Sequence, residues 1–402
     1  MKKTVLFLDD EARILEGLQR MLRHMRKDWD MVFEDNPHKA LQLLSTRPVD
    51  VVVSDVRMPA MDGVTFLGQV KDRFPGVARI ILSGHADESL TLRSVKIAHQ
   101  YLAKPCEAEA LKATVARACA VCDLLNNNAL QAAVAGMDTL PSLPTLYSQI
   151  MTELQSPDAS VQRIGEIVAS DPAMTAKILQ VVNSAFFGLR RRVSDPAQAV
   201  NFLGLDTIRS LVLAIGIFSQ FNAFQVKTFS IERLWGHCIE TADLARTIAR
   251  CETETKQLVE DAFLAGLLHD TGKLVLVANA PDLYRQALEA AESGVLPLWQ
   301  AEQQVFGASH AEVGAYLMGL WGLPDQIVAA IAFHHQPAHF AGEDFHALTA
   351  VHGADALLAE AAQGHDGPPS VRIDPDYLAR LKLTDHLDGW RVQCRSALEG
   401  SQ

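Results

Sequence analysis

Residues 51–63, VVVSDVRMPAMDG, decide the fold of the N-terminal part of the chain. Their first half is a short run of valines, which predicts a strand that is buried on both faces of a parallel sheet. Asp55 follows this strand directly. Ligands bind such sheets at the carboxyl ends of the strands, so Asp55 stands where site residues are expected.

Short apolar runs alternate with amphipathic stretches on both sides of this segment, up to about residue 120. This alternation predicts a doubly wound α/β domain in which helices cover both faces of a five-stranded parallel sheet. The predicted strands are Thr4–Leu8, Met31–Phe33, Val49–Ser54, Ala78–Leu82 and Gln100–Ala103. The predicted helices are Glu11–Met25, Pro37–Leu44, Thr65–Arg73, Ser89–Ala98 and Glu107–Ala120.

Charged and hydroxyl side chains stand at the ends of these strands. They are Asp9 and Asp10 after the first strand, Asp55 after the third, Ser83 after the fourth and Lys104 after the fifth. Carboxylates that converge on one point repel each other unless a hard cation such as Mg²⁺ holds them. A carboxylate beside Mg²⁺ can attack a phosphoryl group, while lysine and a hydroxyl bind the transferred oxygens. A solvated acidic loop explains any one of these residues, but not all five of them together at the ends of four strands.

Residues 1–122 resemble a response-regulator receiver domain. The resemblance is carried by the stretches LFLDDE (6–11), VVVSDVRMPAMDG (51–63), IILSG (80–84) and YLAKP (101–105). It implies that the domain binds Mg²⁺ and that a cognate histidine kinase phosphorylates Asp55. It implies further roles for Asp10 as a direct metal ligand, Asp9 as a water-mediated ligand, Arg57 as the donor of a backbone carbonyl, Ser83 and Lys104 as phosphoryl-binding residues, and Tyr101 as the aromatic switch.

A helical linker is predicted at residues 123–137. The stretch 107–135 is rich in Ala and Leu and contains neither Pro nor Gly, so the last receiver helix can continue past the domain edge. Three asparagines at 126–128 equally fit a flexible break. A homodimer formed through the receiver or through 107–135 is compatible with either form.

The formal charge of −12 is unevenly distributed. Residues 1–125 contain 18 basic and 17 acidic residues, whereas the remainder contains 18 basic and 31 acidic residues, a net charge of −13. Binding to DNA requires clustered cations, so the acidic output half argues against a DNA-binding function. No apolar run reaches the roughly 18 residues of a membrane span, and six cysteines without a regular framework fit reduced thiols in the cytoplasm.

From Thr139 onward strand signals nearly vanish, which predicts an all-α output domain at 138–340. Further helices, predicted at about Leu348–Ala362 and Tyr377–Leu398, would pack on or complete this domain within residues 341–402.

Polar residues in apolar surroundings indicate the chemistry of this part. The stretch 261–268, DAFLAGLL, predicts a buried helix that leads directly into His269 and Asp270. A charged aspartate there is costly unless it is paired or bound to metal. The side chains available to meet it are His237, His310, His334, His335 and Asp355. This set can form one or two octahedral sites for Fe or Mn, with Lys273 neutralising phosphate oxygens, or it can form a hydrogen-bonded polar core without metal.

Residues from about 138 to 340 resemble the HDOD domain, a relative of the HD phosphohydrolases. The stretches that carry this resemblance are LPSLPTL (140–146), DPAMTAKILQVVNSAFFG (171–188), AVNFLGLDTIRSLVL (199–213), AFLAGLLHDTGKLVL (262–276), EQQVFGASHAEVGAYLMGLWGLP (302–324) and AIAFHHQP (330–337). HDOD domains are mostly regarded as having lost the metal-dependent activity of their HD relatives.

This chain instead keeps a counterpart for each ligand of the two-metal HD-GYP phosphodiesterases, which cleave cyclic di-GMP. The likeness implies that Asp270 bridges two metals. It assigns His237, His269 and Asp355 to one metal, assigns His310, His334 and His335 to the other, and matches Lys273 to the lysine after the HD pair. The Gly-Tyr-Pro signature is absent after His335.

These features together predict a cytoplasmic two-component response regulator. A histidine kinase would phosphorylate Asp55, and the HDOD domain would respond as a module that docks downstream signalling proteins. The alternative is a receiver-gated, metal-dependent phosphohydrolase in which Asp270 and Lys273 are catalytic and the ligand is a phosphate ester or cyclic dinucleotide. We expect neither DNA nor a membrane as a partner.

Overall fold

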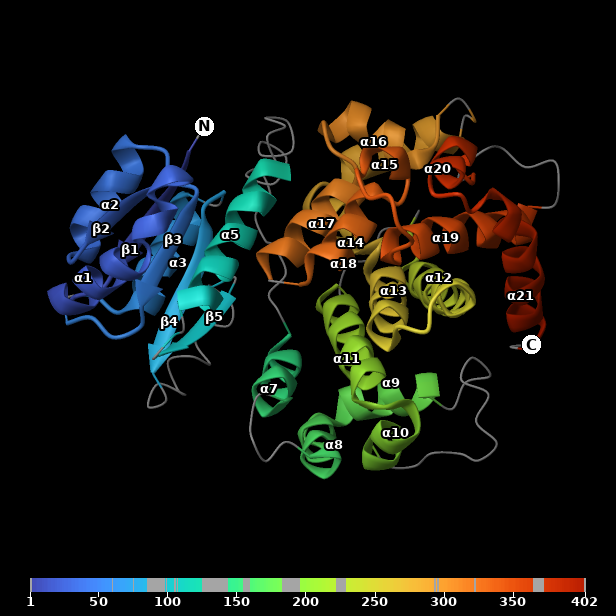
Figure 1. Ribbon diagram of the computed structural model, residues 1–402, viewed down its shortest axis with the longest axis horizontal. Helices are drawn as coiled ribbons and strands as arrows, with labels where there is room; N and C mark the ends of the chain where they lie inside the picture. The colour runs from blue at the N-terminus through green and yellow to red at the C-terminus, as the bar shows by residue number, and fades with distance from the viewer. Residues whose placement is uncertain are drawn as a thin grey trace. The chain divides into compact units, whose positions relative to one another are not determined.

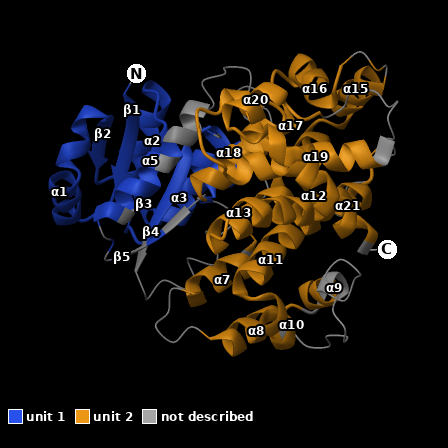
Figure 2. Ribbon diagram, turned by 45° about the vertical axis from the view of Figure 1, so that its right-hand side comes forward, with its two compact units in different colours: residues 1–143, 316–323 blue, residues 144–315, 324–402 orange. Residues whose placement is uncertain are grey.

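The computed structural model describes the chain except residues 1, 60, 75, 85–97, 99, 105, 107, 125–143, 155–159, 183–195, 222–228, 293, 295, 322, 364–371 and 401–402. The chain divides into two compact units (Figure 2). The first comprises Met1–Leu143 together with Tyr316–Leu323, and the second comprises Pro144–Ala315 together with Pro324–Gln402.

The first unit is built on a parallel sheet of five strands in the order β2-β1-β3-β4-β5 (Figure 1). The prediction of a parallel α/β sheet is confirmed. The strands are β1 (Lys3–Leu8), β2 (Trp29–Glu34), β3 (Val51–Asp55), β4 (Ala78–Gly84) and β5 (Gln100–Lys104). The described helices of this part are α1 (Ala12–Met21), α2 (Pro37–Thr46), α3 (Gly63–Arg73) and α5 (Ala108–Leu124).

Three helix predictions are matched only in part by the described residues. The helix expected over Glu11–Met25 is shorter, because α1 ends at Met21 and a tighter 3₁₀ turn, η1 (Arg23–Lys27), follows it. The helix expected over Ser89–Ala98 lies outside the described residues except for Ala98. The expected continuation of the last receiver helix can be followed only to Leu124, where the described part of α5 ends.

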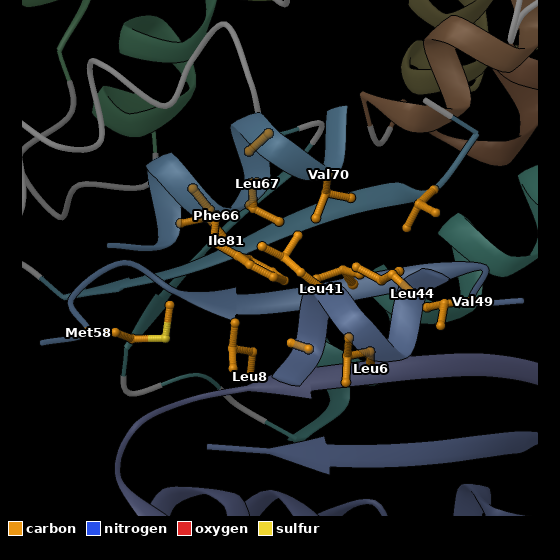
Figure 3. Packing of buried hydrophobic residues seen from close by; sticks show 14 of the residues in the cluster. Leu6, Leu8, Leu41, Leu44, Val49, Met58, Phe66, Leu67, Val70 and Ile81 are labelled. Atoms are coloured by element: carbon orange, nitrogen blue, oxygen red, sulfur yellow. The ribbon is translucent and has the colours of Figure 1, made fainter. Parts of the chain in front are cut away.

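The receiver core is formed where α2 and α3 pack on one face of the sheet. Leu6 and Leu8 of β1 and Ile81 of β4 meet side chains of both helices (Figure 3). The alternate residues of β1 are also buried, so the strand is apolar on both faces, as expected for a parallel sheet with two covering layers. The helix residues of this cluster include Leu41 and Leu44 of α2 and Phe66, Leu67 and Val70 of α3.

Gly63 fixes the loop that leaves β3. A Cβ atom at this position would lie 1.9 Å from the backbone oxygen of Asp55, so only glycine fits. The neighbouring Asp62 caps α3 by accepting a hydrogen bond from the backbone N–H of Thr65 at 2.6 Å. The turn after Asp55 is therefore held tightly against the end of the strand.

The second unit is mostly helical in its described residues, as predicted (Figure 1). Helix α13 is buried from Asp261 to its end at Leu268, in agreement with the apolar circumference of that stretch. The α-helices after residue 143 are α7 (Thr145–Leu154), α8 (Val161–Ala169), α9 (Pro172–Val182), α10 (Pro196–Leu203), α11 (Leu205–Gln220), α12 (Ile231–Glu252), α13 (Lys256–Leu268), α14 (Thr271–Asn279), α15 (Pro281–Glu292), α16 (Leu298–Phe306), α17 (His310–Leu320), α18 (Asp325–Phe333), α19 (Ala347–Gln363), α20 (Pro375–Arg380) and α21 (Leu387–Gly400). The end of α17, from Tyr316, is assigned to the first unit.

The predicted single helix over Tyr377–Leu398 is wrong. Lys382 has a φ of 61°, a left-handed conformation that a helix cannot contain, and it separates α20 from α21. The short 3₁₀ turn η5 (Thr384–His386) then leads into α21. The helix predicted at Leu348–Ala362 corresponds closely to α19.

The last helix is anchored on α12. Trp390 of α21 is 1% exposed and donates a hydrogen bond from its ring nitrogen to Glu252 at 2.7 Å. His386 Nδ1 lies 2.9 Å from the same carboxylate. The helices that follow residue 340 are thus packed into the output unit.

None of the described helices is, by itself, both long and apolar enough to cross a membrane. Residues 197–203 and 205–220, in α10 and α11, reach that length and composition only as a pair, and the pair is bent by 117°.

Candidate functional sites

The receiver site lies at the carboxyl ends of three strands. Lys104, the last residue of β5, donates a hydrogen bond to Asp9 Oδ2 at 2.7 Å and forms a very short ion pair with Asp55 Oδ1. The backbone N–H of Arg57 donates to Asp55 Oδ2 at 3.0 Å. Parallel pairing of β1, β3 and β5 through the sheet brings these ends to one edge. The structure therefore brings together Asp9, Asp55, Lys104 and the backbone of Arg57.

The electrostatics of this site favour an added cation. Burial raises the pKa of Asp55 above its ordinary value, although Lys104 acts in the opposite direction and Asp9 adds to the rise. Burial alone would lower the pKa of Lys104, but hydrogen bonds to Asp55 and Asp9 outweigh it and raise that pKa. Lys104 thus faces the two buried carboxyl groups of Asp9 and Asp55, and its single positive charge cannot neutralise both of them when they are ionised.

The other predicted receiver residues are placed less completely. Asp10 follows Asp9 and is exposed. Ser83 and Tyr101 lie on β4 and β5, but their side chains are outside the described part of the chain.

The output site is assembled at the ends of buried helices. His269 caps the C-terminus of α13, and Asp270 starts α14. His310 is the first residue of α17, and His334 caps the C-terminus of α18. The remaining predicted members are His237 in α12, Asp355 in α19 and His335 directly after His334.

Asp270 is the centre of this cluster. Its Oδ1 lies 3.0 Å from His310 Nε2 and 3.9 Å from His334 Nε2. Its Oδ2 lies 3.5 Å from both His237 Nε2 and His269 Nε2, and 2.5 Å from Lys273 Nζ. The two carboxylate oxygens therefore face two different sets of imidazoles, which is the arrangement that a bridging ligand requires.

The seven predicted residues fall into two adjoining groups. In one group Asp270, His310, His334 and His335 each place a ligand atom within 4.8 Å of the others. In the other, His237, His269 and Asp355 do the same. Within the groups, His335 Nε2 lies 3.0 Å from His310 Nε2, and His237 Nε2 lies 3.3 Å from Asp355 Oδ1. This division matches the assignment expected from the HD-GYP likeness.

Three of the imidazoles form a hydrogen bond through Nδ1, the ring nitrogen that points away from Asp270. His269 Nδ1 lies 2.8 Å from the backbone oxygen of Gly266, and His334 Nδ1 lies 2.8 Å from that of Ile331. His310 Nδ1 lies 2.5 Å from Glu302 Oε2. A carbonyl or carboxylate can only accept, so Nδ1 carries the proton in each ring and Nε2 faces Asp270. Metal-binding histidines have this arrangement.

Two buried polar atoms in the cluster lack a well-aligned hydrogen bond among the described residues. They are Asp270 Oδ1, which has His310 Nε2 3.0 Å away, and His334 Nε2. Burial of an unsatisfied acceptor is costly. Lone pairs of nitrogen and oxygen that converge without donors fit a transition-metal ion by donor type and number.

The pKa values reflect the same crowding. Burial lowers the pKa of His334 to about 3, and burial next to His334 and His310 also holds the pKa of His335 well below its usual value. Burial opposes ionisation of Asp270, but His269, Lys273 and His310 outweigh it and hold the pKa of that carboxyl far below its usual range. His334 and His335 are therefore neutral and Asp270 is ionised at pH 7, the forms in which these side chains bind metals.

The site is partly open to solvent. His237 and Lys273 have side-chain exposures of 33% and 17%, whereas those of His269 and His334 are 0%. His335 is also partly exposed, so an incoming ligand can reach the cluster at these three side chains.

Two buried polar residues near the site were missed by sequence reasoning. Glu302 of α16 is 0% exposed and contacts His310. His352 of α19 is 2% exposed and lies 2.8 Å from the backbone oxygen of His334 through Nδ1. The spacing of His352, three residues before Asp355, was a signal that could have placed both on one helix face.

Comparison with protein families identifies both parts of the chain. Residues 5–116 match the response regulator receiver domain, and residues 140–337 match the HDOD domain. The chain therefore contains a receiver domain followed by an HDOD domain. Asp355 lies beyond the matched HDOD residues.

Individual relatives each match part of the chain. An uncharacterized protein from Treponema pallidum is 29% identical over 203 residues, which cover 50% of this chain and 39% of that protein. The hydrogenase transcriptional regulatory protein HoxA from Cupriavidus necator is 36% identical over 117 residues, or 29% of this chain and 24% of HoxA. The chain thus spans less than half the length of these curated relatives.

Solved structures show the same fold at low identity. An HDOD domain protein of unknown function from Geobacter sulfurreducens has a TM-score of 0.55 and 22% identity, and the match covers 69% of this chain and 98% of that one. A structure from Marinobacter aquaeolei, whose name proposes a role in signal transduction, has a TM-score of 0.55 and 18% identity, covering 90% of this chain and 87% of that one.

Proposed function

We propose that phosphorylation of Asp55 by a histidine kinase controls the HDOD domain, which acts as a signalling module that docks downstream proteins. The contacts of Lys104 with Asp9 and Asp55 carry this proposal. In it, Asp9, Asp10, Asp55 and the backbone carbonyl of Arg57 would hold Mg²⁺, which would supply positive charge to the phosphoryl group. Lys104 and Ser83 would bind the phosphoryl oxygens, and Tyr101 would sense the change. Asp55 attacks the donor phosphorus, a P–O bond forms to its carboxylate oxygen, and the bond to the leaving group breaks.

The module boundaries belong to the same proposal. We place the receiver at 1–122, a helical linker at 123–137, the HDOD domain at 138–340 and the helices that complete it at 341–402. We place the reaction in the cytoplasm, where kinases draw on ATP. A homodimer is part of the proposal, and DNA is not among the proposed partners.

Small-molecule phosphodonors test the acceptor. With acetyl phosphate and Mg²⁺, the intact wild-type protein should gain one acid-labile phosphoryl adduct by mass spectrometry, because the Asp55 carboxyl lies beside Lys104 and can act as the nucleophile. Asp55→Asn should gain none, since an amide cannot act as the nucleophile. The control Asp35→Asn changes an exposed carboxylate and should label like wild type. Equal labelling of Asp55→Asn would contradict the assignment.

A second candidate function is metal-dependent hydrolysis of a phosphate ester in the output domain, which one observation favours. The two adjoining ligand groups around Asp270 would hold one or two Fe or Mn ions. Such ions, when bound, supply Lewis-acid chemistry to a phosphate ester. Asp270 would bridge them, Lys273 would neutralise phosphate oxygens, and the partly exposed His237 would line the entrance. A cyclic dinucleotide is one ester of this class.

Metal analysis tests this candidate. Protein purified without oxygen should contain roughly stoichiometric Fe or Mn, because the donor atoms already lie close together in the absence of metal. Elemental mass spectrometry measures the metal content. His269→Ala and Asp270→Ala should lose most of it. His339→Ala changes an exposed histidine outside the cluster and should keep the wild-type content. Wild-type protein that contains no metal would contradict this candidate function, and the docking function would then be the only one proposed.

A further inference from the structure

Glu302 is a buried carboxylate with a single described hydrogen-bonding partner residue. It is 0% exposed, and its Oε2 accepts hydrogen bonds only from His310, whereas Oε1 has no partner among the described residues. A buried carboxylate is costly, and one with half of its acceptor capacity unused is costlier still. Stability alone would favour an apolar residue here.

The contact with His310 uses two donors of one residue. Glu302 Oε2 lies 2.8 Å from the backbone nitrogen of His310 and 2.5 Å from its Nδ1. The first bond satisfies a free N–H at the start of α17, and the second fixes the rotation of the imidazole. With Nδ1 bound to Glu302, Nε2 lies 3.0 Å from Asp270 Oδ1 and 3.0 Å from His335 Nε2.

The helix that carries Glu302 supports two members of the same ligand group. Trp299, one turn earlier in α16, stacks on His335 with ring centroids 5.9 Å apart and planes 16° from parallel. His269 and His334, in contrast, are held by backbone oxygens of their own helices. His310 begins its helix and has no preceding turn to hold it, so its support must come from another element.

We propose that Glu302 is the positioning residue of the four-residue ligand group, because it fixes the His310 imidazole with Nε2 directed at Asp270. The expected effect on metal affinity rests on the proposed metal binding, whereas the orientation of His310 by Glu302 does not. Glu302 does not itself coordinate the ion; it sets the orientation of a ligand, and removal of such a support weakens metal binding by about 10–100-fold.

Two measurements on the full-length protein test it. The first is the affinity for Mn²⁺ alone, from the electron paramagnetic resonance signal of the free ion. The second is the nuclear magnetic resonance signal of the nitrogen-bound ring proton of His310, recorded on metal-free protein labelled with ¹⁵N-histidine. The signal is assigned by its absence from His310→Gln. In wild type, this Nδ1 proton should resonate far downfield and exchange slowly, because it is held in a short bond to a carboxylate.

The variants separate positioning from helix capping. Glu302→Ala should lose the downfield proton and bind Mn²⁺ about 10–100-fold more weakly. Glu302→Gln keeps an acceptor oxygen, so the proton should remain but move upfield, with a smaller loss of affinity. Glu312→Gln is the control, because Glu312 accepts hydrogen bonds from Ser309 at the same helix start and has no described hydrogen bond or ion pair with His310. It should match wild type in both measurements.

The outcomes distinguish this inference from the proposed function. Wild-type protein that binds no Mn²⁺ would contradict metal binding, and the proton signal would then decide the role of Glu302 by itself. A folded Glu302→Ala or Glu302→Gln protein with an unchanged His310 proton signal would overturn the inference, whatever the Mn²⁺ affinity. An equal loss in Glu312→Gln would assign the effect to capping and overturn it as well.

Discussion

At the scale of the residue, His352 shows how hydrogen bonds determine the protonation state of a buried imidazole. Its Nδ1 lies 2.8 Å from the backbone oxygen of His334, and its Nε2 accepts a hydrogen bond from the backbone N–H of Asp374 at 2.9 Å. One nitrogen must donate and the other must accept, so only the neutral ring satisfies both contacts. Burial accordingly lowers the pKa of His352 below its ordinary value.

This arrangement predicts a pH dependence of stability in the metal-free protein. The unfolded chain binds a proton near pH 6.5 and the folded His352 does not, so its contribution is complete above pH 6.5 and declines as the pH falls. Each such imidazole lowers the free energy of unfolding by at most about 1.4 kcal/mol per pH unit in that range.

Urea unfolding between pH 8 and 5.5, followed by circular dichroism, measures the effect. His352→Gln should be less stable at pH 8 and should show a shallower decline with falling pH than wild type. The exposed His339→Gln should keep the wild-type slope. An unaltered slope in His352→Gln would show that another group carries the acid sensitivity.

At the scale of the element, the output site depends on how closely two helices approach. A Cβ atom on Gly272 of α14 would lie 2.0 Å from the backbone oxygen of His310, which begins α17. Backbone atoms cannot move aside as a flexible side chain can, so the two helix starts meet here only because residue 272 is glycine. The same approach brings His310 to Asp270.

We therefore expect Gly272→Ala to separate α14 from α17. The overpacking should destabilise the output unit by about 3 kcal/mol and weaken Mn²⁺ binding. Gly389→Ala is the matched control, since a Cβ there meets nothing within 4 Å in α21, and alanine should raise stability by about 0.5–1 kcal/mol. Thermal unfolding of both variants measures the difference, and a stable Gly272→Ala with wild-type Mn²⁺ affinity would refute it.

The helices and strands also show which elements the hydrophobic periodicity of the sequence can predict. The buried strands and α13 were predictable because apolar runs with clear ends have few alternative structures. The break between α20 and α21 was not, because Lys382 is an ordinary helix residue whose left-handed φ depends on its surroundings. The 3₁₀ turn after α1 was missed for the same reason, since Arg23–Lys27 carries no proline or glycine.

At the scale of the whole molecule, the sequence predicted which residues meet in the output site but not what supports them. The seven residues around Asp270 stood out because they are polar in apolar surroundings. Glu302 did not, because a glutamate followed by two glutamines reads as a solvated helix face. Its burial arises from the packing of α16, a long-range property that no local pattern records.

The wide spacing of the donors along the chain has a consequence for biosynthesis. His237 and Asp355 are 118 positions apart, and α19 must dock before the carboxylate of Asp355 can reach His237. During translation, six of the seven donors are synthesised before the seventh, Asp355, is added. If the output domain takes up metal as proposed, the complete cage is available only to a finished domain, and the ion is selected from the cellular pool after translation has passed this helix.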